Sequence, residues 1–336
     1  MPALNNPITV LGAGSWGTAL ALLLARNGHA VRLWANKSER VAQMIAERCN
    51  RRYLADHVFP TNVQPVADLA GVRESAAVLI AVPSGGYAEL LRDLAPHLTK
   101  ETPVICATKG FESGTGRLLH QVFAERCDDS NLRYATLSGP TFAADVAKGL
   151  PTAVTLAAER AELRTQLSQL LHDENFRVYT TGDIVGVELG GASKNIFAIA
   201  AGVCDGLGFG ANARAALITR SVAEMMRLGA ALGGQRETFM GLAGVGDLIL
   251  TCTENQSRNR RFGLALAVGD NVEHALKEIG QVVEGISAAR EVRGLAQRHG
   301  IDMPIVMQVN AILDGQCTPR DAVRKLLQRE PKAEQH

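Results

Sequence analysis

The sequence predicts an α/β protein in two parts, a doubly wound, mostly parallel sheet followed by an all-helical C-terminal domain. The first half alternates short apolar runs with helical patterns, which is typical of a parallel sheet covered by helices on both faces. After Asp183 the strand signals stop, and long segments rich in Ala, Leu, Ile and Met follow with helical spacing. A glycine-rich turn joins the first apolar run to the first helix.

Seven short runs in the first half are strand candidates. Most of them are almost continuously apolar, as expected of strands that are buried on both faces. In chain order they are Ile8 to Leu11, Ala30 to Trp34, Ala77 to Val82, Val104 to Thr108, Tyr134 to Leu137, Thr152 to Leu156 and Phe176 to Tyr179. Helical spacing separates several of them, for example over Thr18 to Asn27 and Gly114 to Arg126.

Five helical segments make up the second half. They are expected over Ile184 to Val203, Asn212 to Leu232, Arg261 to Val268, Ile286 to His299 and Pro304 to Leu313. Before them, Thr180-Thr181-Gly182-Asp183 indicates a turn that ends in a helix N-cap. We therefore expect one domain at residues 1–183 and a second at 184–336, with a polar tail from Arg329.

Composition excludes several classes of protein. With 35 basic and 34 acidic residues the net charge is +1, so no global field favours nucleic acid or an anionic membrane. The first strand begins too early to leave room for a signal peptide, and no apolar run is expected to approach the roughly 18 residues that span a membrane. The cysteines are scattered, without CxxC pairs or zinc-type spacing, which indicates reduced thiols, a cytoplasmic protein and no metal; they are Cys49, Cys106, Cys127, Cys204, Cys252 and Cys317.

The glycine-rich turn has the pattern of a dinucleotide fingerprint. Gly12, Gly14 and Gly17 form GxGxxG directly after a strand and at the start of a helix, the context that makes the motif specific and predicts a Rossmann-type domain. Gly12 permits the tight turn, Gly14 lets the backbone approach a pyrophosphate, and Gly17 lets the helix pack on the strand. The motif leaves flavin, NAD and NADP open, as well as a redox sensor that binds the nucleotide without catalysis.

One lysine stands inside an apolar helix. Between Ile184 and Val203 the only charges are Glu188 and Lys194, and a helix that is apolar all round is buried. A lysine there either reaches the surface with its head group or loses water in a cleft, where burial lowers its pKa. In the second case Lys194 is a candidate general acid and base for a carbonyl and alcohol pair.

An aspartate stands in a glycine-rich, apolar segment, Gly241 to Leu248. If Asp247 is buried it requires a donor, because an unpaired buried carboxylate is costly. Lys194 or a substrate hydroxyl would serve, and a helix N-cap is the structural alternative.

Basic and small residues suggest an anion site. The segment Ser257-Arg258-Asn259-Arg260-Arg261 leads into a helix, where arginines and free backbone N–H groups suit phosphate, although a solvated basic face has the same pattern. Lys109 and the segment Ser138 to Thr141 follow two of the strands, at the edge where doubly wound sheets bind ligands. His29, His57, His97 and His120 show no pairing and are interpreted as structural or surface residues.

The second strand predicts the choice of nicotinamide cofactor. NAD-specific sheets carry an acidic residue at its end, which binds the ribose 2′-hydroxyl. Here Asn36 and Lys37 follow the strand, and the nearest acid is Glu39. Asn36 can donate to a hydroxyl or a phosphate, and no arginine stands in this loop before Arg40. We therefore expect NADPH to be used at least as well as NADH, with a modest preference and no strict specificity.

Seven ordered segments resemble one family. GAGSWGTALA, ATKGFE, LSGPTFA, ELGGASKNIFAIAAG, GLAGVGDLILTC, NQSRNRRFG and VVEGISAA are similar to the NAD(P)-dependent glycerol-3-phosphate dehydrogenases of the soluble bacterial type, and they run from Gly12 to Ala289. The resemblance implies reversible reduction of dihydroxyacetone phosphate to sn-glycerol 3-phosphate, which supplies glycerophospholipid synthesis. Its partners would be a phosphorylated triose and NADPH or NADH, with no nucleic acid, metal or membrane insertion, and a homodimer is kept as a hypothesis.

The resemblance also implies roles for individual residues. Lys194 would be the proton donor and acceptor, Asp247 would contact the substrate hydroxyls, and Lys109 would stabilise the developing charge. The substrate would also contact Gly139, Thr141, Ser257, Arg258 and Asn259. The cofactor would contact Gly12, Gly14, Ser15, Trp16, Gly17, Asn36, Lys109, Ala143, Arg258, Val282 and Glu284.

Two other functions are weighed against this one. Dehydrogenases of the 3-hydroxyacid or 6-phosphogluconate type also carry a lysine on the first helix of the second domain, but the SRN and ATKGFE segments argue against them. A redox-sensing binding module would need no buried lysine.

Overall fold

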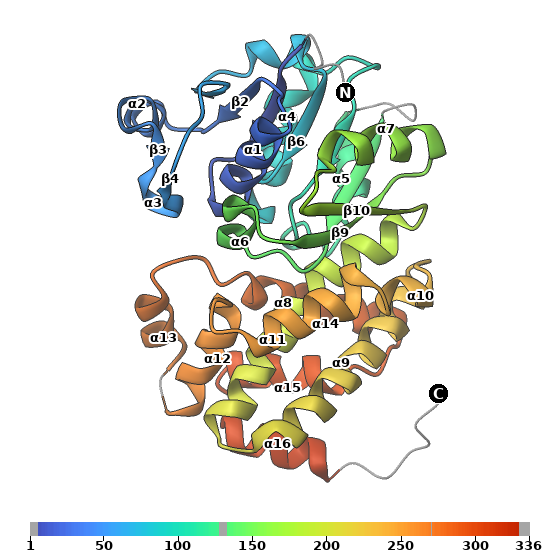
Figure 1. Ribbon diagram of the computed structural model, residues 1–336. Helices are drawn as coiled ribbons and strands as arrows, with labels where there is room; N and C mark the ends of the chain where they lie inside the picture. Colours follow the sequence, from blue (N-terminus) through green and yellow to red (C-terminus); the bar gives the residue numbers. More distant parts are fainter. Residues whose placement is uncertain (1–5, 128–132, 270, 329–336) are drawn as a thin grey trace.

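An eight-stranded sheet runs through the first half of the chain, with helices on both of its faces (Figure 1). The computed structural model describes residues 6–127, 133–269 and 271–328, so the expected tail from Arg329 lies outside the described residues. All neighbouring strands are parallel except β8 and β9. Across the sheet the strands are β10 (Phe176–Thr181), β9 (Thr152–Ala157), β8 (Tyr134–Ser138), β7 (Val104–Cys106), β6 (Ala77–Ile80), β1 (Ile8–Leu11), β2 (Val31–Trp34) and β5 (Val63–Val66).

The chain enters the sheet at β1 and extends from it in both directions. β2 and β5 lie on one side of β1, whereas β6, β7 and β8 lie on the other. The order reverses between β1 and β6, and this is the point where open α/β sheets bind ligands, beyond the carboxyl ends of the strands. The doubly wound, mostly parallel sheet expected from the apolar runs is confirmed.

Alternate residues of each central strand enter two different cores. Val10 and Leu79 pack in the core on one face, and Leu11 and Val78 pack in the core on the other. Because both faces are covered, these strands are apolar along their whole length. The helices of this half are α1 (Ser15–Arg26), α2 (Ser38–Glu47), α3 (Arg51–Leu54), α4 (Tyr87–Leu94), α5 (Leu119–Arg126), α6 (Ala143–Lys148) and α7 (Ala161–Leu171), with 3₁₀ turns at Ala70–Glu74, Ser84–Gly86 and Ala95–His97.

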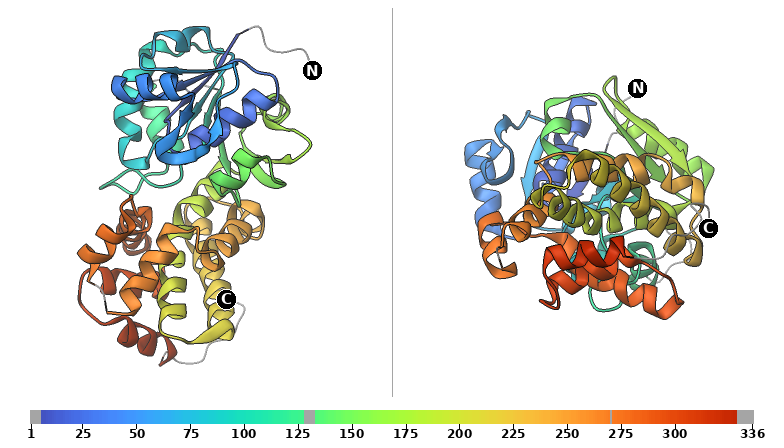
Figure 2. Two further views of the ribbon diagram at one scale, coloured as in Figure 1. Left: turned by 60° about the vertical axis from the view of Figure 1, so that its left-hand side comes forward. Right: turned by 90° about the horizontal axis from the view of Figure 1, so that it is seen from below.

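The described part of the second half is helical and surrounds one long helix, α8 (Ile184–Gly206), as the two views in Figure 2 show. Asp183 caps α8 as expected, since its side chain accepts a hydrogen bond from the Gly186 N–H. The other helices are α9 (Gly210–Ala231), α10 (Arg236–Phe239), α11 (Asp247–Thr253), α12 (Arg258–Ala267), α13 (Val272–Ile279), α14 (Glu284–His299), α15 (Pro304–Leu313) and α16 (Pro319–Leu327), and a π-helical turn, η4, covers Leu242–Gly246.

The expectation that no apolar run approaches membrane-spanning length is wrong for α8. This helix is 23 residues long and apolar enough to pass the test of length and composition. Most of it is buried inside the protein, in contact with α9, α11, α12 and α14. Its composition is explained by its position at the centre of the helical core, since a helix buried on all sides is apolar on all sides.

Two expected boundaries are wrong because of local backbone conformation. The helix expected from Gly114 begins only at Leu119, because Gly114 and Gly116 have positive φ angles of 83° and 72°. The loop before it carries Phe111 and Leu118 into the core of the helical half, which ties the two halves together. Thr180 and Thr181 belong to β10 and not to a turn, because they pair with β9.

After α2 the chain leaves the main sheet over residues 49–58, a segment called the excursion, which was not predicted. β3 (Cys49–Asn50) and β4 (Ala55–Val58) pair antiparallel around α3, outside the main sheet. The chain then returns as β5, whose sequence Val63–Val66 contains Pro65. Proline cannot donate to the ladder and is tolerated only at an edge, which is where β5 lies.

Candidate active site

The first glycine-rich turn has the backbone geometry that a dinucleotide requires. Gly12 has φ +114°, and a Cβ there would stand 2.7 Å from the Ala81 carbonyl oxygen at the end of β6. A Cβ on Gly17 would stand 1.9 Å from the carbonyl oxygen of Gly12, so α1 packs directly on the turn. Gly14 has no heavy atom within 4 Å of the same position, which leaves open space beside the backbone N–H groups of the helix start.

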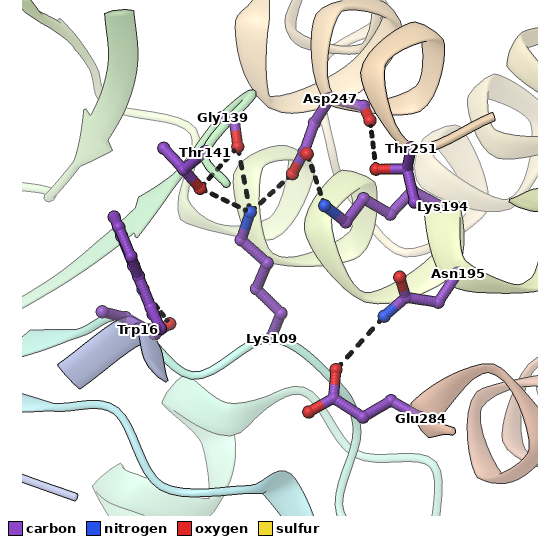
Figure 3. A network of polar contacts seen from close by, with 10 residues as sticks. Trp16, Lys109, Gly139, Thr141, Lys194, Asn195, Asp247, Thr251 and Glu284 are labelled. Atoms are coloured by element: carbon purple, nitrogen blue, oxygen red, sulfur yellow. Dashed lines mark hydrogen bonds and ion pairs between the residues drawn. The ribbon is translucent and has the colours of Figure 1, made fainter. Parts of the chain in front are cut away.

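Three ionisable side chains meet beyond the carboxyl ends of the strands, as Figure 3 shows. The Lys109 Nζ donates to Asp247 Oδ2 at 2.6 Å, and the Lys194 Nζ donates to the other carboxylate oxygen, Oδ1. Asp247 is completely buried and Lys194 is 8% exposed. The alternative of a surface-reaching lysine is therefore wrong, and so is that of an N-cap, because Asp247 is the first residue inside α11 and Gly246 is its N-cap. The expected pairing of Asp247 with Lys194 is confirmed.

Glycines allow the two elements that hold this cluster to approach each other. A Cβ on Gly190 would stand 2.4 Å from the carbonyl oxygen of Ala243 in the π-helical turn. One helical turn later α8 carries Lys194, and Asp247 follows the π-turn directly. Segments of π-helix are uncommon and are often found at functional sites. Close backbone contact at Gly190 thus fixes the distance between Lys194 and its carboxylate partner.

Burial changes the acidity of one lysine in the cluster. Loss of water lowers the pKa of Lys109 to about 8, although the negative charge of Asp247 opposes this change and Lys194 adds to it. At neutral pH a larger fraction of Lys109 is therefore in the neutral form than for an exposed lysine. Within residues 6–127, 133–269 and 271–328, no group of three or more His, Cys, Asp or Glu side chains is placed to hold a metal ion.

The residues expected around Lys109 are brought together. Its Nζ also donates to the Gly139 carbonyl at 3.0 Å and to the Thr141 hydroxyl at 3.4 Å. Trp16 lies nearby in α1, where its indole N–H donates to the carbonyl of Ala107 at 3.1 Å (Figure 3). Ala143 begins α6 and packs, with Trp16, against the core of the sheet.

The two C-terminal segments expected to hold phosphate and cofactor also lie side by side. Asn259 Oδ1 accepts from the Gly285 N–H at 2.9 Å, and Arg258 donates to Gln281 at 3.3 Å. The Glu284 carboxylate accepts from the amide of Asn195, the residue after Lys194, at 3.3 Å. These contacts join α8, α12 and the start of α14.

Other residues expected to contact the substrate or the cofactor lie apart from the cluster. The Ser257 hydroxyl caps α12 by accepting from the Arg260 N–H, so it has a structural partner already. Asn36 is exposed on the loop after β2, and Val282 is 61% exposed before α14. Ser15 is the first residue of α1 and is partly buried.

Outside the lysine–aspartate cluster, sequence reasoning missed the contacts of Arg40 and His120. Arg40 reaches back from α2 to the carbonyl of Ala13, and its only sequence signal was its position after the second strand. His120, interpreted as structural or surface and without a pairing, lies 2.8 Å from Glu188 on α8. The expectation that His120 is unpaired is therefore wrong. The pair was missed because 68 residues separate His120 from Glu188 in the sequence.

Comparisons with known proteins agree over both halves of the chain. The family model for the N-terminus of NAD-dependent glycerol-3-phosphate dehydrogenase matches residues 7–164, and that for the C-terminus matches residues 183–324. Glycerol-3-phosphate dehydrogenase [NAD(P)+] of Nitrosococcus oceani is 54% identical over 98% of this chain and 96% of its own, and that of Serratia proteamaculans is 51% identical over 100% and 99%. The crystal structure of glycerol-3-phosphate dehydrogenase from Coxiella burnetii has a TM-score of 0.92 and 48% identity, covering 96% of this chain and 99% of its own.

Proposed function

This chain belongs to the NAD-dependent glycerol-3-phosphate dehydrogenase family, and from that we infer that its buried Lys109–Asp247–Lys194 cluster reduces dihydroxyacetone phosphate to sn-glycerol 3-phosphate, reversibly and with NADPH or NADH. The single observation that carries the site assignment is the sharing of one fully buried carboxylate by two lysines at the ligand-binding edge of the sheet. Burying three charged groups costs free energy of desolvation, and a redox sensor that only binds the nucleotide does not require them.

The nucleotide-binding half fits a nicotinamide dinucleotide. Open space beside Gly14 and the free N–H groups at the start of α1 suit the pyrophosphate, with Ser15 and Trp16 at the helix start. Ala143, Val282 and Glu284 are proposed as further contacts. When bound, the cofactor supplies the hydride for the C2 carbonyl of the substrate.

Residues of the chain supply the proton for the C2 oxygen and the positive charge that stabilises it. We assign Lys194 as the group that donates a proton to the forming C2 alkoxide, becoming a neutral amine that takes a proton back from solvent. Asp247 holds both ammonium groups in place and accepts from substrate hydroxyls. With both lysines protonated the cluster has a net charge of +1, which stabilises the negative oxygen of the transition state.

The phosphate end is assigned to the start of α12. Arg258 lies in the first turn, where backbone N–H groups and a guanidinium suit a phosphate, and Asn259 stands beside it. Gly139 and Thr141, whose oxygens accept hydrogen bonds from Lys109, are assigned as further substrate contacts. Fixing the phosphate places the carbonyl carbon relative to Lys194, which lowers the entropic cost of reaction.

The proposal also covers the domain boundary, the cellular location, the use of the product and the assembly. The domain boundary lies between Asp183 and Ile184, which is supported by the change there from the last strand to α8. The enzyme acts in the cytoplasm, supported by its scattered free cysteines, and its product supplies glycerophospholipid synthesis. A homodimer is the proposed assembly.

Oxidation of NADPH and NADH with dihydroxyacetone phosphate tests the reaction, and Lys194→Met tests the site. Methionine keeps most of the volume of the lysine but cannot transfer a proton. We expect kcat to fall about 10²- to 10⁴-fold, as for other general acids, with cofactor binding nearly intact. Lys148→Met, at an exposed position on α6, is the matched control. A folded Lys194→Met protein that keeps more than about a tenth of the wild-type kcat contradicts the assignment.

A further inference from the structure

Arg40 on α2 contacts the nucleotide-binding turn from the side. Its Nη2 donates to the carbonyl of Ala13 at 3.2 Å, and Ala13 stands between the first two glycines of the GxGxxG motif. In doubly wound sheets this turn carries the pyrophosphate, and the end of the second strand lies beside the adenosine ribose. Arg40 therefore lies beside the turn expected to carry the pyrophosphate, on the helix that follows the second strand.

The excursion around α3 holds the guanidinium of Arg40 in position. The guanidinium carbon lies 5.3 Å from the centroid of the Tyr53 ring, and that of Arg52 lies 5.6 Å from the same centroid. Stacking on an aromatic ring orients the planar guanidinium while its edge keeps its N–H donors. Asn50, also in the excursion, donates to Ala13 at 3.0 Å and to the hydroxyl of Thr18 at 2.8 Å. The excursion is thus anchored to the nucleotide-binding turn.

Lys37, Arg40 and Arg52 form a group of positive charges that the described part of the chain does not neutralise. Among the residues that the structure describes, no carboxylate lies within ion-pair distance of Lys37, Arg40 or Arg52. The nearby Glu47 is held by Arg51 at 3.0 Å. Two arginines gathered on one tyrosine repel each other, so the arrangement favours an anion between or beside them.

We propose that Arg40, oriented by Tyr53 and supported by Arg52, binds the 2′-phosphate of NADP(H) and is the source of a preference for NADPH. The end of β2 has no acidic residue to bind a 2′-hydroxyl, and Asn36 and Lys37 are exposed on the loop that follows it. The specificity-determining residue thus stands on α2 and not in the loop. This inference rests on the proposed function, since the cofactor is that of the proposed reaction.

Binding of two nucleotides by titration calorimetry tests the inference without turnover. Adenosine 2′,5′-bisphosphate carries the 2′-phosphate, and adenosine 5′-monophosphate lacks it. Because a charge-assisted hydrogen bond is lost, Arg40→Ala should weaken binding of the bisphosphate about tenfold or more, and binding of the monophosphate less than about threefold. The kcat/KM ratio of NADPH to NADH should fall by the same factor.

Two further variants make the outcome decisive. Arg177→Ala removes an equal charge from β10, at the far edge of the same sheet, and should change neither affinity. Arg40→Lys keeps the charge without the planar group and should retain part of the discrimination. Folding is protected in Arg40→Ala because Asn50 still donates to Ala13.

The possible results separate the inference from the function on which it rests. Equal losses for both nucleotides, or no loss for either, overturn the role of Arg40 and leave the proposed reaction standing. A wild-type protein that binds the bisphosphate tightly, through Arg40, but turns over no dihydroxyacetone phosphate overturns the proposed reaction alone.

Discussion

At the scale of single residues, Asp247 is the carboxylate that balances part of the positive charge of Lys109 and Lys194. A carboxylate that is completely buried without a donor would cost several kcal/mol, and here each of its oxygens has an ammonium partner. The need for a donor could be predicted from the apolar sequence around Asp247, and so could Lys194, because it is the lone cation in an apolar helix. The contact with Lys109 was not predictable from the sequence, because 138 residues separate the two and they meet only where the helical half packs on the sheet.

Arg258 leads to a prediction about substrate choice. If it binds the phosphate, Arg258→Ala should lower kcat/KM for dihydroxyacetone phosphate about 10- to 150-fold, the range of a charge-assisted hydrogen bond. Dihydroxyacetone, which has no phosphate, should be affected little. Steady-state kinetics with both substrates measures the difference. Arg261→Ala, an exposed position on the same helix, is the control, and equal losses for the two substrates would show that Arg258 does not bind the phosphate.

At the scale of elements, α15 depends on a buried acid from another helix. Glu224 on α9 accepts from the backbone N–H groups of Ile305 and Val306, at 2.7 and 3.2 Å, in the first turn of α15. Burial raises the pKa of Glu224 to about 7, although these two hydrogen bonds and Arg227 lower it. Between pH 4.5 and about 7, Glu224 is therefore protonated in the folded protein but ionised in the unfolded chain.

The sign of this shift gives a stability prediction. The contribution of protonated Glu224 is fully present below about pH 4.5 and is lost as pH rises through about 7, by at most about 1.4 kcal/mol per pH unit. Glu224→Gln does not titrate, so the difference in Tm between wild type and variant should change between pH 5 and pH 8, in favour of the wild type at the lower pH. Glu237→Gln, at an exposed position, is the control. A difference in Tm that is constant with pH would contradict this account.

The elements themselves were predictable where a single pattern determined them. Continuous apolar runs indicated the central strands, and Pro304–Leu313 begins and ends where its periodicity predicted. β5 was missed because Pro65 interrupts a short strand that only an edge position allows. The start of α5 was placed too early, because positive φ angles at Gly114 and Gly116 cannot be inferred from helical spacing alone.

At the scale of the whole molecule, a buried polar network connects the sheet to the helical half. Glu188 on α8 accepts from the Tyr134 hydroxyl of β8 at 2.5 Å and from His120 of α5, through the backbone N–H at 3.2 Å and with Nδ1 at 2.8 Å. Burial lowers the pKa of His120, but the hydrogen bond and charge of Glu188 outweigh it and raise this pKa above 6.5. The change from strands to helices at Asp183 could be predicted from periodicity, whereas contacts across the boundary could not.

This network predicts a pH-dependent link between the two halves. Because the pKa of His120 is raised in the folded protein, its stabilisation is fully present below about pH 6.5 and is lost as pH rises through the raised value. His120→Gln should therefore destabilise the protein most at low pH, by about 1.5–3 kcal/mol for a hydrogen bond to a charged group. Denaturant unfolding at pH 6 and pH 9 measures the change, with His97→Gln as a control on the first half. A loss of equal size at both values would show that the charge of His120 contributes nothing.

The apolar character of α8 has a consequence for protein synthesis. The 93 residues between Gly206 and the end of α14 at His299 take roughly 5 to 20 s to translate, and only after this time are both of the partners α12 and α14 complete. A nascent segment of this length and hydropathy resembles what a translocon accepts. Lys194, the eleventh of the 23 residues of α8, opposes insertion by about 2.5–3.5 kcal/mol, the cost of a charge near the middle of a membrane. The lysine assigned to proton transfer is thus also a residue that disfavours a membrane-spanning state of this helix.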